Sequence, residues 1–172
     1  MSATDLFPLT AAQRDIWLDQ ISRGDSPLYN VGGYVKLVGD VDLFLLQRAF
    51  EQLVAAHEGL RTVLLPGAGA DGLPMQRYAD FIPVSMPLHD LRGHPEGIDA
   101  GRALIREQMQ RPYALEGTPL FRFCLVRPCE GQYWLGIQAH HLILDGWGFG
   151  QLLKSLAEQY TALAEGQSLD LQ

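Results

Sequence analysis

The sequence predicts an α/β domain, an α+β sandwich in which helices pack against a mixed, mostly antiparallel sheet. Three runs are rich in strand-forming residues, and they occupy residues 30–38, 120–127 and 132–140. Amphipathic patterns with a period near that of a helix lie between these runs and after the last of them. A short turn joins the last two runs, so we expect them to form an antiparallel hairpin. The length of 172 residues suits one domain.

The composition is that of a folded protein, and it disfavours several classes of function. Apolar residues make up 47% of the chain and charged residues 19%, which favours a buried core over disorder. The net charge is −7 and no basic stripe is visible, so nucleic acid and anionic membranes are not expected partners.

The chain carries no sequence signal for export or membrane insertion. Its N-terminus lacks a signal peptide, and no apolar stretch reaches the ~20 residues that span a bilayer. Cys124 and Cys129 have no partners at zinc-binding spacing, which is typical of free thiols in a reducing compartment. We therefore expect a cytoplasmic protein.

In the first half of the chain, a helix is expected to begin at Thr10, because Thr10 and Gln13 have the spacing of a capping box. Residues 24–27 end this helix. The strand over residues 30–38 contains Gly32 and Gly33, which predict a bulge or a close approach of another backbone. A single apolar stripe then predicts a helix over residues 42–57.

The second half of the chain continues with short strands, a helix, the hairpin and a last helix. In order, these are strands near residues 60–65, 75–78 and 83–88, a helix after residue 101 that runs to Arg111-Pro112, hairpin strands over 120–127 and 132–140 with a turn at 128–131, and a helix over 149–164. The strand near 83–88 is the weakest prediction, because its prolines cannot donate hydrogen bonds to a sheet.

Two adjacent histidines, His140 and His141, close the last strand, and Asp145 and Gly146 open the last helix. Side chains alternate across a strand, so one imidazole can point inward while the other faces a cavity. An imidazole can take and return a proton near neutral pH, as acyl transfer requires. The Gly146 N–H, at a helix start, is a suitable donor to a developing oxyanion. No protein nucleophile lies beside the pair, which indicates direct transfer between two bound substrates.

Other interpretations of this corner stay open at this point. A histidine at a strand end is more often a packing or surface residue than a catalyst. A zinc ion could be bound by His140, His141 and Asp145, although the histidines alternate across the strand and no fourth ligand is evident. Asp145 could hold the loop or the ring, or could itself be held by an arginine. The other three histidines are interpreted as non-catalytic.

The corner His140-His141-Leu142-Ile143-Leu144-Asp145-Gly146 resembles the HHxxxDG motif of nonribosomal peptide synthetase condensation domains. Residues 9–17, LTAAQRDIW, resemble the first motif of this family, and residues 57–62, HEGLRT, resemble its second. The three stretches occur in the family's order, and the resemblance runs over nearly the whole chain.

The resemblance implies a fold like that of chloramphenicol acetyltransferase, and a complete domain of two similar lobes with the active site in a tunnel between them. Residues 1–172 would form the N-terminal lobe, and the C-terminal lobe would be absent from this chain. The implied reaction is amide bond formation between a carrier-bound acyl or aminoacyl thioester and the amine of a carrier-bound aminoacyl acceptor. We expect the single lobe to be inactive, because His141 would lie open to water.

The resemblance also implies roles for individual residues. His141 would position or deprotonate the acceptor amine, and Gly146 would line the channel with its N–H near the thioester oxygen. Asp145 would be structural and paired with Arg61 of the second motif, and His140 would be a packing residue. No cofactor would be bound by the lobe itself. The implied partners are donor and acceptor peptidyl carrier proteins, which deliver both substrates on phosphopantetheine arms, the C-terminal lobe, and adjacent adenylation and carrier domains.

Two other functions stay open besides amide bond formation: one uses a different acyl donor and the other involves no catalysis. A coenzyme A-dependent acyltransferase of the same superfamily would share the HxxxDG pattern, and a non-catalytic lobe would only dock carrier proteins. Heterocyclising relatives have an aspartate where His140 stands, so cyclisation is disfavoured. Gly148 stands where many members of the family have serine, a departure that concerns packing and subtype.

Overall fold

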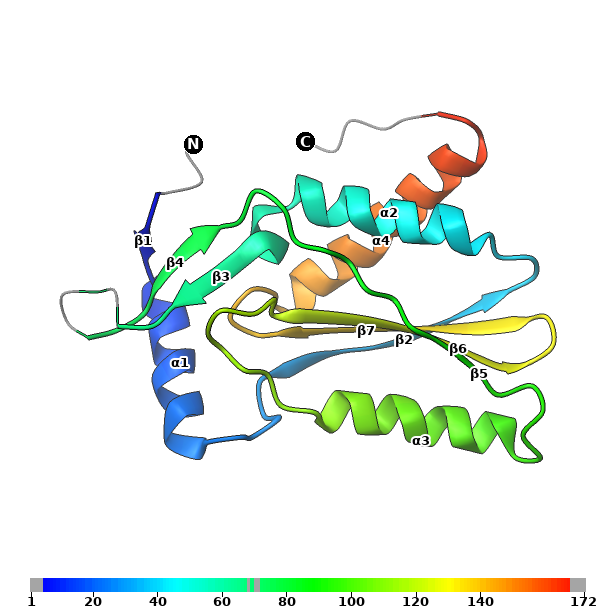
Figure 1. Ribbon diagram of the computed structural model, residues 1–172, viewed down its shortest axis with the longest axis horizontal. Coiled ribbons are helices and arrows are strands. Elements are labelled where there is room, and N and C mark those ends of the chain that lie inside the picture. Colours follow the sequence, from blue (N-terminus) through cyan, green and yellow to red (C-terminus); the bar gives the residue numbers. More distant parts are fainter. Residues whose placement is uncertain (1–4, 68, 70–71, 168–172) are drawn as a thin grey trace.

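The structure is a computed structural model that describes residues 5–67, 69 and 72–167. In this part of the chain the elements follow in the order β1 (Phe7–Pro8), α1 (Ala11–Arg23), β2 (Asn30–Val38), α2 (Leu43–Ala56), a 3-10 turn (Glu58–Arg61), β3 (Thr62–Leu65), β4 (Met75–Tyr78), β5 (Leu88–Asp90), α3 (Gly97–Gln110), β6 (Phe121–Cys129), β7 (Gln132–His140) and α4 (Gly146–Ala164). Figure 1 shows helices on both sides of a central sheet.

The central sheet has the strand order β2-β7-β6-β5, and it is mixed and mostly antiparallel, as predicted. β2 pairs with β7 and β7 with β6 in antiparallel fashion, whereas the short β5 runs parallel to β6. α2 and α4 cover one face of this sheet and α3 covers the other (Figure 1). The predicted layered sandwich of helices and sheet is therefore confirmed.

Successive side chains of β7 point to opposite faces of the sheet, and they pack into two separate cores. Leu135 and Ile137 pack on one face with Phe50 and Leu53 of α2, all of them at most 2% exposed. Trp134 points to the other face, where it packs with Ile105 of α3. Burying a side chain of this size stabilises the fold by roughly 1.5–3 kcal/mol, so the two cores fix the helices on the sheet.

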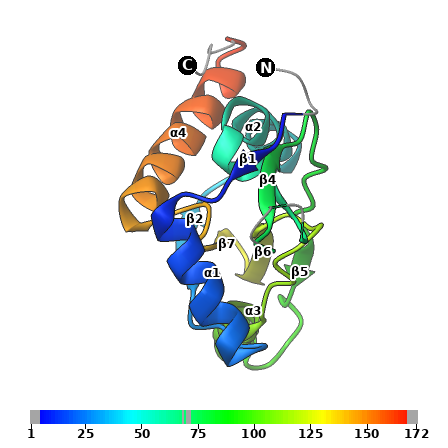
Figure 2. The same cartoon turned by 90° about the vertical axis from the view of Figure 1, so that its left-hand side faces the viewer.

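A second, smaller sheet lies at the end of the molecule where β7 finishes. Its order is β1-β4-β3, with both pairs antiparallel. Figure 2 views the molecule from this end, with α1 and β1 in front of the central sheet, α4 and α2 to one side and α3 to the other. The end of β7 is thus covered by α1 and the small sheet.

Several boundaries differ from the sequence prediction. Residues 58–61 form a 3-10 turn, and the strand expected from residue 60 begins at Thr62. The strand expected over residues 83–88 is found only at Leu88–Asp90. α3 begins at Gly97, inside the stretch expected to be irregular, and α4 begins at Gly146 rather than 149. Asp145 caps α4, and a Cβ on Gly97 would collide with the carbonyl oxygens of Pro128 and Leu91; a periodicity argument detects neither contact.

Glycines permit the closest backbone approaches in the sheet layers. A Cβ on Gly32 would collide with the carbonyl oxygen of Ile137 on the neighbouring strand. The pairing of β2 with β7 continues through this position without a register shift. The sequence therefore predicted the close approach correctly, and the alternative of a bulge is wrong.

Candidate active site

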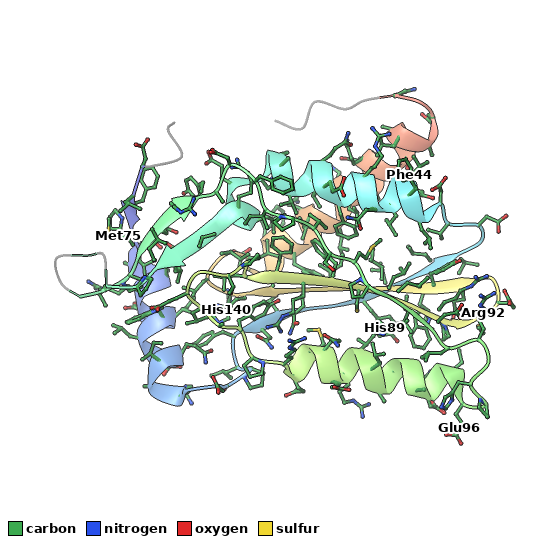
Figure 3. The ribbon with its side chains drawn as sticks, in the orientation of Figure 1. Phe44, Met75, His89, Arg92, Glu96 and His140 are labelled. Atoms are coloured by element: carbon green, nitrogen blue, oxygen red, sulfur yellow. The ribbon has the colours of Figure 1, made fainter. Side chains whose placement is uncertain are left out.

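The two histidines lie where β7 turns into α4. His140 is the last residue of β7 and pairs with Asn30 of β2, and Gly146 is the first residue of α4. Three backbone hydrogen bonds hold the turn: His140 N–H donates to Leu120 at 2.8 Å, His141 N–H to Tyr29 at 2.8 Å, and Ile143 N–H to His140 at 3.0 Å. Figure 3 places His140 at the end of the sheet nearest α1.

His140 is the inward-facing histidine. Its side chain is 1% exposed and lies about 6 Å from the rings of Tyr29 and Tyr113, with centroid separations of 6.0 and 5.9 Å. Its Nδ1 accepts the Leu142 N–H at 3.2 Å, so the neutral ring carries its proton on Nε2. Burial, and to a lesser extent the neighbouring His141, lowers the pKa of His140 to about 4. This imidazole is neutral at physiological pH and is held in one orientation.

His141 is the outward-facing histidine. It is exposed, and its ring makes no hydrogen bond to any residue that the structure describes. Its backbone N–H is nevertheless fixed by the Tyr29 carbonyl. Both ring nitrogens are therefore open to a substrate, while the backbone that carries the ring is anchored.

The structure corrects the expected pairing of Asp145 with Arg61. No ion pair joins these two residues, both of which are described, and Asp145 is exposed. The Asp145 carboxylate instead accepts the Gly148 N–H at 2.7 Å and caps α4. The Arg61 guanidinium donates from one terminal nitrogen to the Ala79 carbonyl at 2.6 Å. The carboxylate has no need of a cation here, because solvent and a helix N–H already satisfy it.

Gly146 presents a free donor at the start of α4. Its N–H is one of the first four of the helix, which have no partner within the helix. It donates to no acceptor in the described part of the chain, and a Cβ at this position would meet nothing within 4 Å. A ligand oxygen can therefore approach this N–H closely, at the positive end of the helix dipole.

A cavity joins the second and third sequence motifs. It has a volume of about 230 Å³ and is lined by His57, Glu58, Gly59, Leu60, Ile143, Leu144, Gly148, Gln151 and Leu152. His57 ends α2, and its Nε2 is buried without a hydrogen-bond partner. A larger cavity of about 490 Å³ lies between the edge strand β2 and α4 and contains neither corner histidine. Neither corner histidine lines the smaller cavity, which borders the turn through Ile143 and Leu144.

Sequence analysis missed a pair of glutamines, of which Gln13 binds this turn and Gln76 binds Gln13. Gln13 of α1 donates to the Leu142 carbonyl at 3.1 Å and to Gln76 of β4 at 3.0 Å. The capping box at Thr10 and Gln13 is present as predicted, but Gln13 has this second set of contacts as well. Its place in the first motif was the available signal, because a cap alone does not require glutamine there.

Other candidate sites are not formed in the described residues. They contain no group of three or more histidine, cysteine or acidic side chains arranged to hold a metal ion. No described helix is long and apolar enough to cross a membrane. Cys124 is buried, which raises the pKa of its thiol, and Cys129 is half-buried; both are free thiols.

Comparison with known proteins agrees with the three motifs. A family model for the condensation domain matches residues 3–172. Isonitrile lipopeptide synthase of Streptomyces coeruleorubidus is 34% identical over 164 residues, which cover 95% of this chain and 11% of that protein. Phosphinothricin tripeptide synthetase PhsC of Streptomyces viridochromogenes is 35% identical over 167 residues, 95% of this chain and 15% of that protein.

Solved structures show the same fold. The starter condensation domain of rhizomide synthetase RzmA matches with a TM-score of 0.89 and 29% identity, covering 98% of this chain and 42% of that one. The first condensation domain of the CDA synthetase matches in fold with a TM-score of 0.87 and 24% identity, over 97% of this chain and 43% of that one. The predicted lobe of the chloramphenicol acetyltransferase type is thereby confirmed, and the chain spans less than half of each solved domain. The chain belongs to the condensation domain family of nonribosomal peptide synthetases.

Proposed function

We propose that residues 1–172 form the N-terminal lobe of a condensation domain that joins a carrier-bound acyl or aminoacyl thioester to the amine of a carrier-bound aminoacyl acceptor. The observation that carries this proposal is the His141 ring, which is exposed and free on both nitrogens although its backbone is anchored. The unpaired Gly146 N–H lies in the same turn, at the start of α4. A base and an oxyanion donor are thus supplied by one short segment.

The proposed reaction uses both groups. The acceptor amine attacks the thioester carbonyl, and a C–N bond forms as the carbonyl becomes a tetrahedral oxyanion. Gly146 N–H donates a hydrogen bond to that oxyanion. His141 positions the amine and takes its proton, the C–S bond breaks, and the proton passes to the departing thiolate of the donor arm. His140 stays neutral in the interior, and Asp145 orients the start of α4 by capping it.

Several partners follow from this proposal. Donor and acceptor peptidyl carrier proteins deliver the substrates on phosphopantetheine arms, and the lobe needs no cofactor of its own. The C-terminal lobe closes the other side of the tunnel, and adenylation and carrier domains lie alongside in the synthetase, which acts in the cytoplasm. The length of the relatives supports this, because the chain covers 15% or less of the two synthetases compared above.

The decisive experiment compares His141→Ala with wild type in the complete two-lobed domain, using loaded donor and acceptor carriers. Loss of a general base typically lowers the rate by about 10²- to 10⁴-fold, so kcat for amide formation should fall by that factor. His94→Ala is the matched control, because His94 is also exposed and lies outside the corner. Wild-type rates in His141→Ala would contradict the assignment of this residue.

A coenzyme A-dependent acyltransferase is the second candidate, because solved forms of a starter condensation domain, that of RzmA, are in complex with C8-CoA. Acyl-coenzyme A and acyl-carrier donors offered separately distinguish the two. Turnover from the carrier alone supports the first proposal, and turnover from coenzyme A alone supports the second. A lobe that only docks carriers would bind them without forming product from either donor.

A further inference from the structure

The turn between His140 and Asp145 is held through the backbone N–H and the backbone carbonyl of Leu142, which belong to successive peptide groups. The N–H of Leu142 donates to Nδ1 of His140 at 3.2 Å, and its carbonyl accepts from Nε2 of Gln13 at 3.1 Å. Leu142 itself is 3% exposed, so water does not compete at this point. His141 precedes Leu142 directly, so these two hydrogen bonds act together with the Tyr29 carbonyl, which accepts the His141 N–H, to fix the backbone that carries the His141 ring.

The Gln13 side chain is itself fixed by hydrogen bonds from and to other residues. Its Oε1 accepts the N–H of Thr10 at 2.9 Å and Nε2 of Gln76 at 2.9 Å, and its Nε2 donates to Gln76 Oε1 at 3.0 Å. Gln76 is 4% exposed and donates in turn to the Pro8 carbonyl at 3.1 Å. The two amides pair face to face, and their donors and acceptors are used by each other and by three backbone groups. A fully paired polar network of this kind fixes a single geometry.

We propose that Gln13 is a positioning residue for His141. It joins α1 and the small sheet to the catalytic turn across 129 residues of sequence, through the Leu142 carbonyl. It does not touch the substrate, and it acts by keeping the His141 backbone where the ring meets the acceptor amine. This inference rests on the proposed function, because it takes His141 as the base.

The test compares Gln13→Glu with Thr10→Ala in the complete condensation domain. A carboxylate at position 13 can still accept the Thr10 N–H, but it cannot donate to Leu142 or Gln76. Thr10→Ala removes the side-chain acceptor of the Gln13 N–H and leaves the glutamine pair in place. The two variants therefore separate the anchor on the turn from the cap of α1.

We expect Gln13→Glu to lower kcat by up to about 100-fold with the KM of both carriers unchanged, because small displacements of a catalytic group cost about that much. Thr10→Ala should retain kcat. The introduced carboxyl regains a donor when it is protonated, so the ratio of variant to wild-type kcat should rise as the pH falls from about 8 to about 5.5. Equal kcat in the two variants, or a ratio that does not change with pH, would overturn the inference.

Amide hydrogen exchange supplies a readout that does not need activity. Exchange at His141, Leu142 and Ile143 should be faster in Gln13→Glu than in Thr10→Ala, since only the first variant frees the turn. If Gln13→Glu does not fold, Gln13→Ala serves the same comparison without a buried charge. Absence of wild-type turnover would contradict the proposed function alone, whereas unchanged exchange in an active domain would contradict the role of Gln13 alone.

Discussion

At the scale of single residues, His140 and His141 are adjacent in sequence but differ in burial and hydrogen bonding. His140 is sealed between two tyrosine rings and hydrogen-bonded, whereas His141 is exposed and free. The same side chain is thus a neutral, buried packing group at one position and an exposed group without a hydrogen-bond partner among the described residues at the next. The end of the strand, where alternate side chains still point to opposite faces, produces this division.

The buried state of His140 predicts a pH dependence of stability. Burial lowers its pKa from 6.5 to about 4 in the folded chain, so below 6.5 the unfolded chain binds a proton that the folded chain excludes. The free energy of unfolding should therefore have its full value above pH 6.5. It should fall by up to about 3 kcal/mol as the pH drops to about 4. Urea unfolding across this range measures the effect.

The matched variants for this prediction are His140→Gln and His141→Gln. The first should flatten the fall in stability between about pH 6.5 and pH 4, because no buried imidazole remains to exclude a proton. The second should leave the fall in place. The same slope in both variants would assign the pH dependence to other groups.

At the scale of elements, α4 begins at an aspartate that acts as a cap. Asp145 accepts the Gly148 N–H, and the N–H of Phe149 donates to the Asp145 carbonyl at 2.9 Å. Asparagine is as good a cap as aspartate, and alanine is not one. Asp145→Asn should therefore retain stability, while Asp145→Ala should lose about 1 kcal/mol in chemical denaturation. An equal loss in both variants would indicate that the charge matters, as an ion pair with Arg61 would require.

Two helical glycines give a second test at this scale, because the same substitution should act in opposite directions. A Cβ on Gly101 of α3 would lie 2.9 Å from the Trp134 ring, whereas one on Gly150 of α4 would meet nothing within 4 Å. Gly150→Ala should stabilise the chain by up to about 1 kcal/mol, because alanine is the better helix former. Gly101→Ala should destabilise it by pushing α3 off the sheet. Thermal unfolding compares the two directly, and stabilisation by both would contradict the packing of α3 on Trp134.

At the scale of the whole molecule, the candidate catalytic turn lies at one end of the sheet, where α1, the small sheet and α4 meet (Figure 2). In the proposed reaction this turn supplies a base and an oxyanion donor, and His141 is exposed rather than enclosed. Catalytic groups act strongly only where water is excluded and both substrates are held in position. The proposed second lobe would provide that enclosure.

Residues 1–172 alone should therefore form no amide product from loaded carriers, while the complete two-lobed domain should do so under the same conditions. Liquid chromatography with mass spectrometry of released product is the measurement. Circular dichroism of the shorter chain is the control, because it shows whether the lobe is folded. Product formed by the folded single lobe at a rate near that of the complete domain would contradict the proposed tunnel.

The sequence by itself determined the pattern of elements and the family. Local periodicity, capping and turns predict the helices at residues 11–23 and 43–56 and the strands at 30–38, 75–78 and 132–140. The HHxxxDG corner was visible because all of its residues lie in one short segment. Local signals of this kind need no knowledge of distant contacts.

Only the tertiary structure decided how that corner is held. It placed His140 in the interior, in agreement with the packing role that the resemblance implied, and it showed that Asp145 caps α4 instead of pairing with Arg61 and that Gln13 reaches Leu142. A carboxylate, a guanidinium and an amide each have several possible partners, and sequence spacing does not rank partners that lie far apart along the chain. The packing of α1, the small sheet and β7 against one another selects among them, because it brings particular donors and acceptors within hydrogen-bonding distance.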